Sequence, residues 1–246
     1  MLFDLSGRTA LVTGAGQNIG AGIARLLAGQ GARVAVNDVD AGRAAATVDE
    51  IVGAGGRAVA VPFDVTDHDA VAAAVAELGD VDVLVNNAGN GGVGGMAVKP
   101  FIETEVADWE GPLRVNVYGV LNCCHAVVPG MVERGWGRVI TISSGAGTAG
   151  VAIGVSPYSA GKGGGIAFTR TLALEVARTG VTANTVAIGL MGFPDPDITA
   201  ALARSIPVGR TGTPEDVGAA CVWLASDEAS WVTGQTIEVN GGAITT

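Results

Sequence analysis

Short apolar runs alternate with longer, alanine-rich segments along the chain. Each short run is four or five residues long and consists mainly of β-branched or other apolar residues, a pattern typical of strands buried on both faces. The runs predict strands at Thr9–Thr13, Arg33–Asn37, Ala58–Pro62, Val83–Asn86, Arg138–Ile142, Thr182–Val186 and Thr236–Val239. The segments between them have helical length and predict helices at Ile19–Ala28, Ala41–Val52, His68–Leu78, Trp109–Glu133, Tyr158–Arg178 and Glu215–Ser226.

This alternation of strand and helix predicts an α/β fold. Apolar strands joined by helical crossovers form a parallel sheet with helices on both faces, and right-handed crossovers wind it into a doubly wound sheet of the Rossmann type. No linker rich in proline or serine divides the 246 residues. We therefore expect a single domain, residues 1–246, with about seven parallel strands.

The charge balance narrows the range of partners. The chain has 14 Lys and Arg residues against 24 Asp and Glu residues, a formal net charge of −10. Such a surface repels both a nucleic-acid backbone and an anionic membrane. A mean hydropathy of +0.43 and a 48% share of hydrophobic residues exclude a disordered chain. We expect a compact protein that binds neither nucleic acid nor membrane.

The cysteines predict a reducing compartment and no metal. The chain has three cysteines, Cys123, Cys124 and Cys221. An odd number with two adjacent residues is a poor basis for a disulfide framework. Cys123-Cys124-His125 has no second ligand cluster, so we interpret it as part of a buried helix. The long uncharged stretches Val115–Val132 and Val139–Gly161 are interrupted by polar residues, Gly or Pro, and no signal peptide is visible. We expect a cytoplasmic protein.

A glycine-rich turn follows the first predicted strand and opens a helix. In Thr13–Gly20, the glycines at 14, 16 and 20 let the backbone approach a pyrophosphate, and the helix N-terminus offers free N–H groups. Asp38 closes the second strand, where a carboxylate accepts the ribose hydroxyls of NAD and repels a 2′-phosphate. No Arg or Lys lies in the turn or directly after Asp38, which favours NAD(H) over NADP(H). In the alternative interpretation, Asp38 caps the helix that begins at Ala41.

A second group of residues suggests acid–base chemistry. Tyr158 and Lys162 lie four residues apart, on one face of a predicted helix. A free tyrosine has a pKa near 10, and a neighbouring ammonium lowers it toward the range that acid–base catalysis needs. Ser143 and Ser144 end the fifth strand at the same edge of the sheet, where a hydroxyl can hold a substrate oxygen. The chain has only two lysines and two tyrosines, so a chance pairing is less plausible.

Together these motifs resemble the short-chain dehydrogenase/reductase family, in its 3-oxoacyl reductase-like and alcohol dehydrogenase-like branch, over essentially the whole chain. The matching motifs are Thr13–Gly20, Asp64-Val65, Asn86-Asn87-Ala88-Gly89, Asn116, Ser144, Tyr158, Lys162, Asn184, Gly189, Gly234-Gln235 and Asn240-Gly241-Gly242.

The resemblance implies a role for each matching residue. Tyr158 is then the general acid/base, Lys162 lowers its pKa and binds the nicotinamide ribose, and Ser144 orients the reacting oxygen. Asn116 holds a water that connects Lys162 to solvent. The implied cofactor contacts are Gly14, Gln17, Asn18 and Ile19 at the pyrophosphate and ribose, Asp64 and Val65 at adenine, Asn87, Ala88 and Gly89 along the cofactor, and Ile188 and Gly189 at the nicotinamide.

Some positions depart from the family pattern. Asn18 stands where glycine is usual, but Asn tolerates a left-handed backbone. Ile188 replaces a proline, and Phe193 stands where a cofactor-binding threonine is common. The spacing from Ser144 to Tyr158 is one residue longer than in many members, which leaves Ser143 as a rival.

The substrate is predicted only by class. Residues 190–207 correspond to the family's variable substrate lid, and their apolar side chains favour an apolar or alicyclic hydroxy compound or a hydroxyacyl thioester; a solvated loop is the alternative. The resemblance implies a homotetramer. The leading hypothesis is an NAD-dependent enzyme that interconverts a secondary alcohol and a ketone. Its rivals are a catalytically silent NAD-binding regulator, a 3-oxoacyl-acyl-carrier-protein reductase, and an epimerase or dehydratase.

Overall fold

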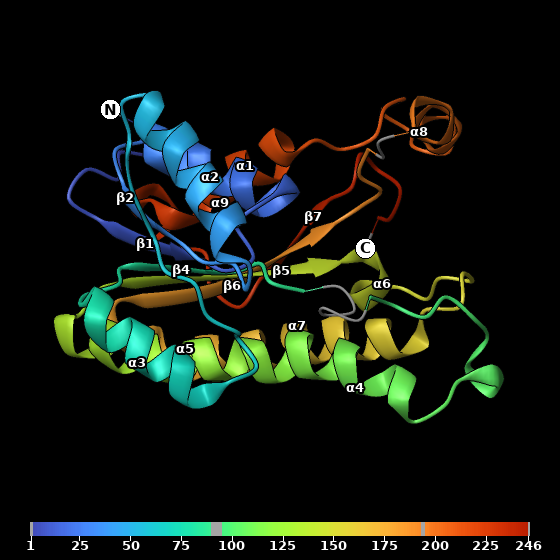
Figure 1. The fold of residues 1–246 in the computed structure, drawn as a ribbon, viewed down its shortest axis with the longest axis horizontal. Helices are drawn as coiled ribbons and strands as arrows, with labels where there is room; N and C mark the ends of the chain where they lie inside the picture. The colour runs from blue at the N-terminus through green and yellow to red at the C-terminus, as the bar shows by residue number, and fades with distance from the viewer. Residues whose placement is uncertain (1, 90–94, 193–194, 246) are drawn as a thin grey trace.

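Seven parallel strands form one sheet in the order β3-β2-β1-β4-β5-β6-β7 (Figure 1). This computed structural model describes residues 2–89, 95–192 and 195–245. The strands are β1 (Thr9–Val12), β2 (Arg33–Val36), β3 (Arg57–Ala60), β4 (Val83–Asn86), β5 (Gly137–Ser144), β6 (Val181–Ile188) and β7 (Thr236–Val239). The predicted fold class and strands are confirmed, and β5 and β6 extend further than the sequence indicates.

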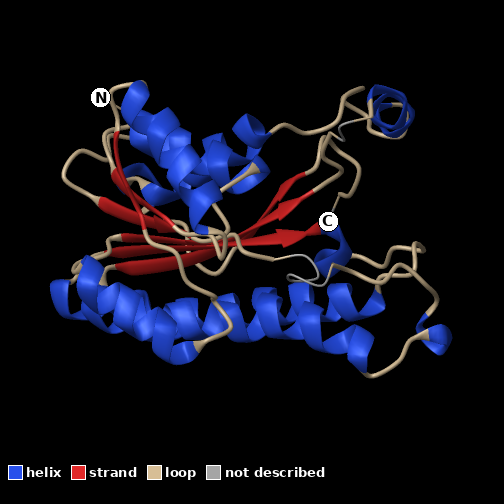
Figure 2. Cartoon of the chain, in the orientation of Figure 1, coloured by secondary structure: helices blue, strands red, loops and turns tan. Residues whose placement is uncertain are grey.

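Helices cover both faces of the sheet, as Figures 1 and 2 show. One face carries α1 (Asn18–Gly29), α2 (Ala41–Gly53) and α9 (Pro214–Ala225), and the other carries α3 (His68–Leu78), α5 (Gly119–Arg134) and α7 (Ser156–Val176). Shorter helical segments are η1 (Phe101–Glu103), α4 (Ala107–Leu113), η2 (Arg114–Tyr118), α6 (Gly145–Thr148), η3 (Ala177–Thr179), α8 (Pro196–Ala203) and η4 (Asp227–Ala229). Apolar periodicity does not predict α6 and α8, because α6 is a single capped turn and α8 has no buried residue.

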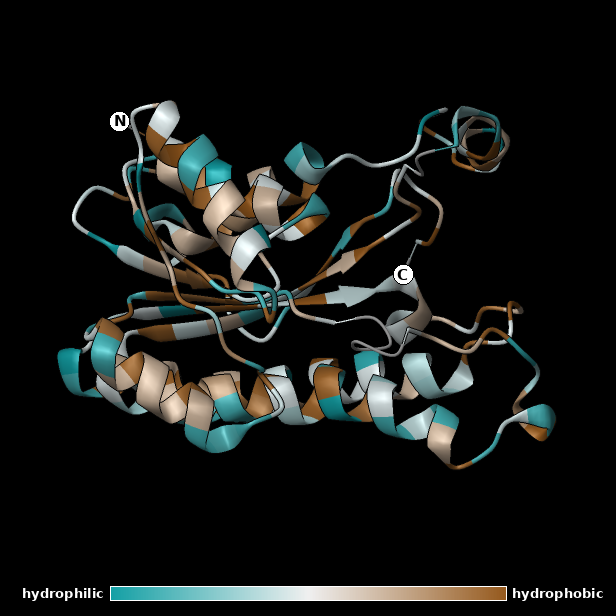
Figure 3. Ribbon diagram, in the orientation of Figure 1, coloured by the Kyte–Doolittle hydropathy of each residue, from teal (hydrophilic) through white to brown (hydrophobic). Residues whose placement is uncertain are grey.

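Successive strand residues serve two separate cores, one on each face. In β1, Leu11 packs with Leu84 and Met131 below the sheet, whereas Val12 packs with Ile23 and Leu224 above it. This twofold alternation is the reason that apolar residues follow one another along the central strands, and Figure 3 also shows polar positions on the strands. The sheet is therefore rigidly held from both sides and can position the loops at its carboxyl edge.

One long helical run crosses the lower face. Segments α4, η2 and α5 follow one another without a break, and η2 is a π-helical turn in its middle. Among the described residues, this run alone is long and apolar enough to cross a membrane by length and composition, and half of its most apolar window is buried in the protein. Its contacts with α3, β4 and β5 are those of a core helix.

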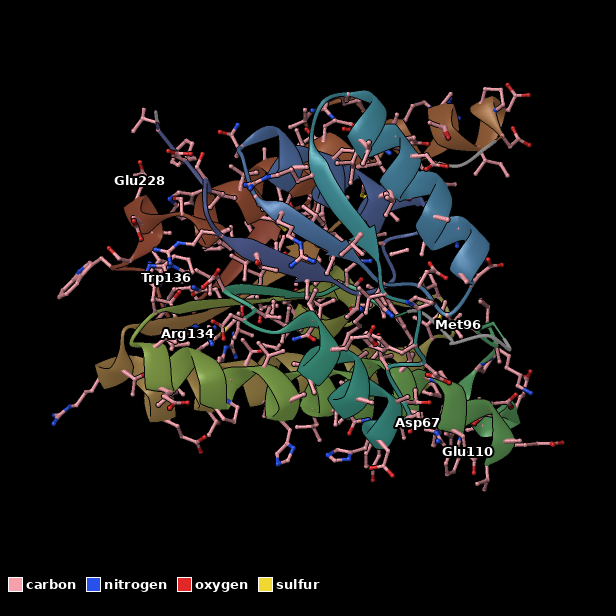
Figure 4. All side chains as sticks on the ribbon, turned by 60° about the vertical axis from the view of Figure 1, so that its left-hand side comes forward. Asp67, Met96, Glu110, Arg134, Trp136 and Glu228 are labelled. Atoms are coloured by element: carbon pink, nitrogen blue, oxygen red, sulfur yellow. The ribbon has the colours of Figure 1, made fainter. Side chains whose placement is uncertain are left out.

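The strand order reverses between β1 and β4. Loops after neighbouring strands diverge at such a point, and they leave a crevice at the carboxyl ends of the strands. Met96 and Glu110 border this crevice at one end of the molecule, and Trp136 and Glu228 lie at the opposite end (Figure 4).

Candidate functional site

A cleft of about 1200 Å³ occupies the crevice. Predicted site residues that border it are Gly14, Gln17, Asn18, Ile19, Asp38, Asp64, Val65, Asn87, Ala88, Gly89, Tyr158, Lys162 and Ile188. The other three predicted residues, Asn116, Ser144 and Gly189, lie directly beside members of this set. A smaller apolar pocket of about 490 Å³, bordered by Phe101, Trp109 and Pro157, contains none of them. The large cleft, with its converging polar groups, is the candidate site.

The glycine turn at the end of β1 is held by the segment that follows β4. Asn87 donates side-chain hydrogen bonds to the carbonyls of Thr13 (2.9 Å) and Gly14 (3.0 Å). Gly14 has a φ of +60°, and a Cβ there would lie 2.8 Å from the Cα of Ala88. Asn18 has a φ of +48°, so this asparagine does adopt the left-handed backbone expected of it. The turn therefore requires glycine at 14 and accepts asparagine at 18.

The N-terminus of α1 opens toward the cleft. Its N-cap residue, Gln17, makes no side-chain capping bond, and the first turn contains no acidic residue. Backbone N–H groups are therefore left available, and the helix dipole adds a partial positive charge. Such an end suits a pyrophosphate.

Asp38 is buried at the border of the cleft and already accepts hydrogen bonds from three residues. Its Oδ2 accepts from the backbone N–H of Gly16 (3.2 Å), and its Oδ1 accepts from the N–H of Asp40 (3.0 Å) and from Nη2 of Arg43 (2.8 Å). The residue that caps α2 is Asp40, which accepts from the N–H of Arg43. The interpretation of Asp38 as a helix cap is therefore wrong.

Arg43 is a residue that the sequence analysis missed. It lies one turn inside α2, and because helical side chains lean toward the N-terminus, its guanidinium reaches back to Asp38. A Cβ on Gly16 would lie 2.6 Å from the Cβ of Arg43, so glycine at 16 makes room for this side chain. No Arg or Lys directly follows Asp38 in the sequence, but in the structure the guanidinium of Arg43 lies against its carboxylate. The sequence signal that could have revealed this pair is the position of Arg43, five residues after Asp38 and at the start of a predicted helix.

Asn37 is a second missed residue, and it ties three loops together. Its Nδ2 donates to the carbonyls of Val61 (3.1 Å) and Phe63 (3.0 Å), and its Oδ1 accepts from the N–H of Gly14 (3.3 Å). These bonds place the exposed carboxylate of Asp64 and the buried Val65 beside the glycine turn.

Tyr158 and Lys162 share one turn of α7, as predicted. The Nζ of Lys162 is buried, donates to the carbonyl of Ile142 (2.8 Å) and lies 5.9 Å from the centre of the Tyr158 ring. Burial lowers the pKa of Lys162 to about 8. Burial also raises the pKa of Tyr158, against a smaller lowering by its hydrogen bond with Ser144. The expected lowering of the tyrosine pKa by Lys162 is absent from this arrangement, because burial dominates and the ammonium is directed at Ile142.

The two serines at the end of β5 have different partners. Ser144 hydrogen-bonds Tyr158 through its side chain and accepts from the N–H of Ala146 (3.2 Å). Ser143 also borders the cleft, but its hydroxyl donates to the backbone carbonyl of Lys162 (3.2 Å). Successive side chains of a strand point to opposite faces of the sheet, so Ser143 and Ser144 point in different directions and Ser144 is the one that faces Tyr158.

Asn116 lies in the π-helical turn η2, close to the ammonium of Lys162. Its Nδ2 donates to the carbonyl of Pro112 (2.8 Å). A Cβ on Gly89 would stand 2.7 Å from Nζ of Lys162 and 2.9 Å from Oδ1 of Asn116. Because residue 89 has no side chain, these two polar groups approach the same point. A π-helical turn is frequent at functional sites.

The far end of the cleft is formed by Ile188 and Gly189. Ile188 pairs with Ser144 in the sheet register and borders the cleft. Gly189 donates its N–H to the carbonyl of Val239 (3.0 Å), and a Cβ there would lie 2.7 Å from the Cα of Asn240. The C-terminal segment thus supports this end.

The segment predicted as a lid contains α8. Asp195 caps this helix, and Ile198 is 48% exposed. Figure 1 shows α8 standing apart from the sheet beyond the carboxyl ends of the strands. Phe193 and the glycine-rich residues 90–94 lie outside the described residues.

The cysteines are buried and make no ligand cluster. Burial raises the pKa of the Cys124 and Cys221 thiols to about 12 and that of Cys123 higher still. Over the described residues, no three His, Cys, Asp or Glu side chains gather closely enough to hold a metal ion.

Comparisons with known proteins agree with this geometry. Residues 14–244 match the family model described as enoyl-(acyl carrier protein) reductase. The chain is 38% identical to the (2S)-((R)-hydroxy(phenyl)methyl)succinyl-CoA dehydrogenase subunit BbsD of Thauera aromatica, over 97% of both proteins. A crystal structure of a 3-oxoacyl-acyl carrier protein reductase with bound NAD from Brucella melitensis superposes with a TM-score of 0.91 at 36% identity, covering 99% of this chain and 94% of that one. A gluconate 5-dehydrogenase from Burkholderia cenocepacia in complex with NADP and tartrate gives 0.89 at 35% identity, with coverage of 98% and 96%.

Proposed function

Because the chain belongs to the short-chain dehydrogenase/reductase family, whose members are nicotinamide-dependent oxidoreductases, we propose that it is an NAD(H)-dependent enzyme that interconverts a secondary alcohol and a ketone. The observation that carries the proposal is the placement of Ser144, Tyr158 and Lys162 around one end of a cleft whose other end is a pyrophosphate cradle. A hydroxyl, a phenol and an ammonium in this order suit proton transfer at a carbonyl oxygen.

Each residue of the site has its own role in the proposed reaction. A bound nicotinamide supplies or accepts the hydride, which is the cofactor's own chemistry. In the reduction, the Ser144 hydroxyl holds the ketone oxygen, and the phenol of Tyr158 gives its proton to that oxygen as negative charge develops. Lys162, with a pKa of about 8, returns a proton toward Tyr158 near neutral pH. Asn116, whose Oδ1 approaches the same point beside Gly89 as the Lys162 ammonium, positions the path by which Lys162 exchanges protons with solvent. Oxidation of the alcohol reverses each transfer.

A rise in the tyrosine pKa is compatible with this role. Burial favours the neutral phenol, which is the form that donates a proton in the reduction. Lys162 and a bound ribose act on the phenolate that remains after transfer. The same tyrosine would act as base only when that phenolate is stabilised.

The preference for NAD(H) rests on Asp38. Its carboxylate is fixed by two backbone N–H groups at the place where an adenosine ribose lies in this fold, and it repels a 2′-phosphate. Arg43 is engaged by that carboxylate, so a phosphate would have to draw the guanidinium away. We therefore propose NAD(H) as the preferred cofactor.

The substrate we propose is apolar and carries no strong anion at its reacting end. Lys99 is paired with Asp108 (2.7 Å), a residue that borders the cleft, and the exposed position on α7 at 174 is an apolar leucine (78% exposed) rather than a cation. With a net charge of −10, docking of an acidic carrier protein is disfavoured. An alicyclic alcohol or a hydroxyacyl thioester fits better. We further propose a homotetramer in which α7 meets its symmetry mate, which would cover Leu174.

The test is a spectrophotometric screen at 340 nm of NAD⁺ reduction with alicyclic, steroid and hydroxyacyl-CoA alcohols, run in parallel with NADP⁺. We expect turnover on at least one secondary alcohol, faster with NAD⁺. Tight NADH binding with no turnover on any alcohol would instead indicate a silent regulator. Product formation without net NADH change would indicate an epimerase or dehydratase.

A further inference from the structure

The only two histidines of the chain touch each other on the surface, away from the cleft. His68 begins α3 and His125 lies on α5, 57 residues later. Their ring centres are 5.3 Å apart with the planes at 46°, and Nε2 of His68 lies 3.3 Å from Nδ1 of His125. Both residues are exposed. The proposed reaction does not use either side chain.

A carboxylate orients the first imidazole. Oδ1 of Asp69 lies 3.1 Å from Nδ1 of His68. When Nδ1 carries the proton and donates to Asp69, the lone pair of His68 is on Nε2, the nitrogen that faces His125. A carboxylate behind an imidazole is the usual outer partner of a metal-binding histidine, because it sets the tautomer and makes the ring more basic.

The surrounding contacts hold the two backbones in place. Asp67 caps α3 by accepting from the N–H groups of Asp69 and Ala70 (both 3.1 Å). From α5, Asn122 donates to the carbonyl of Val65 (2.9 Å), three residues before His68. The start of α3 is thus fastened to α5 beside the two rings, so little has to be ordered when a ligand binds between them.

We propose that His68 and His125 form a two-histidine site for a divalent transition metal, with Asp69 as the orienting carboxylate. Metal–imidazole bonds of about 2.0–2.1 Å to two nitrogens 3.3 Å apart enclose an angle of roughly 107°, close to the tetrahedral value. Imidazole nitrogens select Cu²⁺, Ni²⁺ and Zn²⁺ over Mg²⁺ and Ca²⁺, and among the former Cu²⁺ binds most tightly. Water completes the coordination.

The site is separate from the thiols next to it in the sequence. Cys123 and Cys124 lie on the buried face of α5 and pack in the core, so His125 alone of that motif reaches the surface. A bound metal would link α3 to α5 and would lie a few residues from Val65, which borders the cleft. We therefore expect the metal to stabilise the fold while leaving the reaction itself unchanged.

The test uses the full-length chain without a histidine tag, freed of metal by EDTA and titrated with CuCl₂. We expect one Cu²⁺ per chain with an electron paramagnetic resonance spectrum showing two nitrogen ligands. At a free metal concentration about 100 times the dissociation constant, the unfolding midpoint should rise by on the order of 5 °C, reversibly with EDTA.

Matched variants test whether Cu²⁺ binds to the two histidines rather than to another surface group. His68→Gln and His125→Gln should each remove the two-nitrogen signal and the thermal shift, and Asp69→Asn should weaken binding about 10-fold. NADH binding should be the same in His125→Gln and in the unaltered chain. Equal Cu²⁺ binding by the unaltered chain and His125→Gln, a one-nitrogen spectrum, or no binding at all would each overturn the proposal and leave a hydrogen-bonded pair.

Discussion

Replacing Lys162 with methionine should make the protein more stable while removing a group that the proposed reaction needs. Lys162 is 7% exposed, and burial lowers its pKa from 10.5 to about 8. At about 1.4 kcal/mol per unit, keeping this charge buried at neutral pH costs roughly 3 kcal/mol. The hydrogen bond from Nζ to the Ile142 carbonyl (2.8 Å) is lost in the variant, at about 1.5–3 kcal/mol for a charged donor. We expect Lys162→Met to gain up to about 1.5 kcal/mol in free energy of unfolding at pH 7.

The pH dependence of this gain has a definite sign. The folded-state pKa of Lys162 lies below the unfolded value, so between pH 8 and 10.5 the unfolded chain holds a proton that the folded chain has released. The stability of the unaltered protein therefore rises with pH in that window relative to the variant. At pH 9 the advantage of Lys162→Met should have shrunk by about 1.4 kcal/mol.

The assay is urea denaturation of both proteins at equal concentration, at pH 7 and pH 9. Equal concentration matters because assembly contributes to apparent stability. The buried cysteines and Tyr158, whose raised pKa values act in the opposite direction, are present in both proteins and cancel in the difference. A variant clearly less stable at pH 7, or a difference that stays the same at both pH values, would refute the reasoning.

Two further substitutions test the cofactor cradle. Asp38→Ala should raise the dissociation constant of NADH about 10- to 100-fold, because hydrogen bonds to a charged group are worth about 1.5–3 kcal/mol. The same variant should bind NADPH more tightly, because Arg43 is released from the carboxylate, and Asp38→Ala/Arg43→Met should lose this gain in NADPH affinity. Fluorescence titration measures both dissociation constants. Gly14→Ala should cost at least about 1–2 kcal/mol of stability and weaken NADH binding, because φ is +60° and Ala88 lies 2.8 Å from the new Cβ. Gly29→Ala, in open space on α1, is the matched control and should be neutral or stabilising by denaturation.

Local patterns determine much of this molecule, which is why the strands and long helices could be read from the sequence. The central strands β2, β1, β4, β5 and β6 are buried on both faces, so their apolar runs are recognisable, whereas the edge strands β3 and β7 are only partly buried. The glycine turn, Asp38 and the Tyr158–Lys162 turn lie at the ends of such elements, and the topology alone brings them to one edge. In contrast, α8 buries nothing and leaves no apolar period.

Contacts between distant segments could not be read in the same way. The contact of His68 with His125, 57 residues apart, depends on how α3 packs on α5. The burial of Lys162, which decides its pKa, follows from closure of η2 and β5 around it. A charge count along the chain contains none of this information.

Proton transfer by Tyr158 is the centre of the proposed mechanism, and the Tyr158→Phe variant tests it most directly. The measurement compares the turnover of NAD⁺ with the best secondary alcohol, and the dissociation constant of NADH, between the unaltered protein and the variant. We expect turnover to fall by at least about 100-fold, the range of general acid–base catalysis, while the NADH dissociation constant changes by less than about 3-fold. Turnover within a few-fold of the unaltered protein would contradict the account.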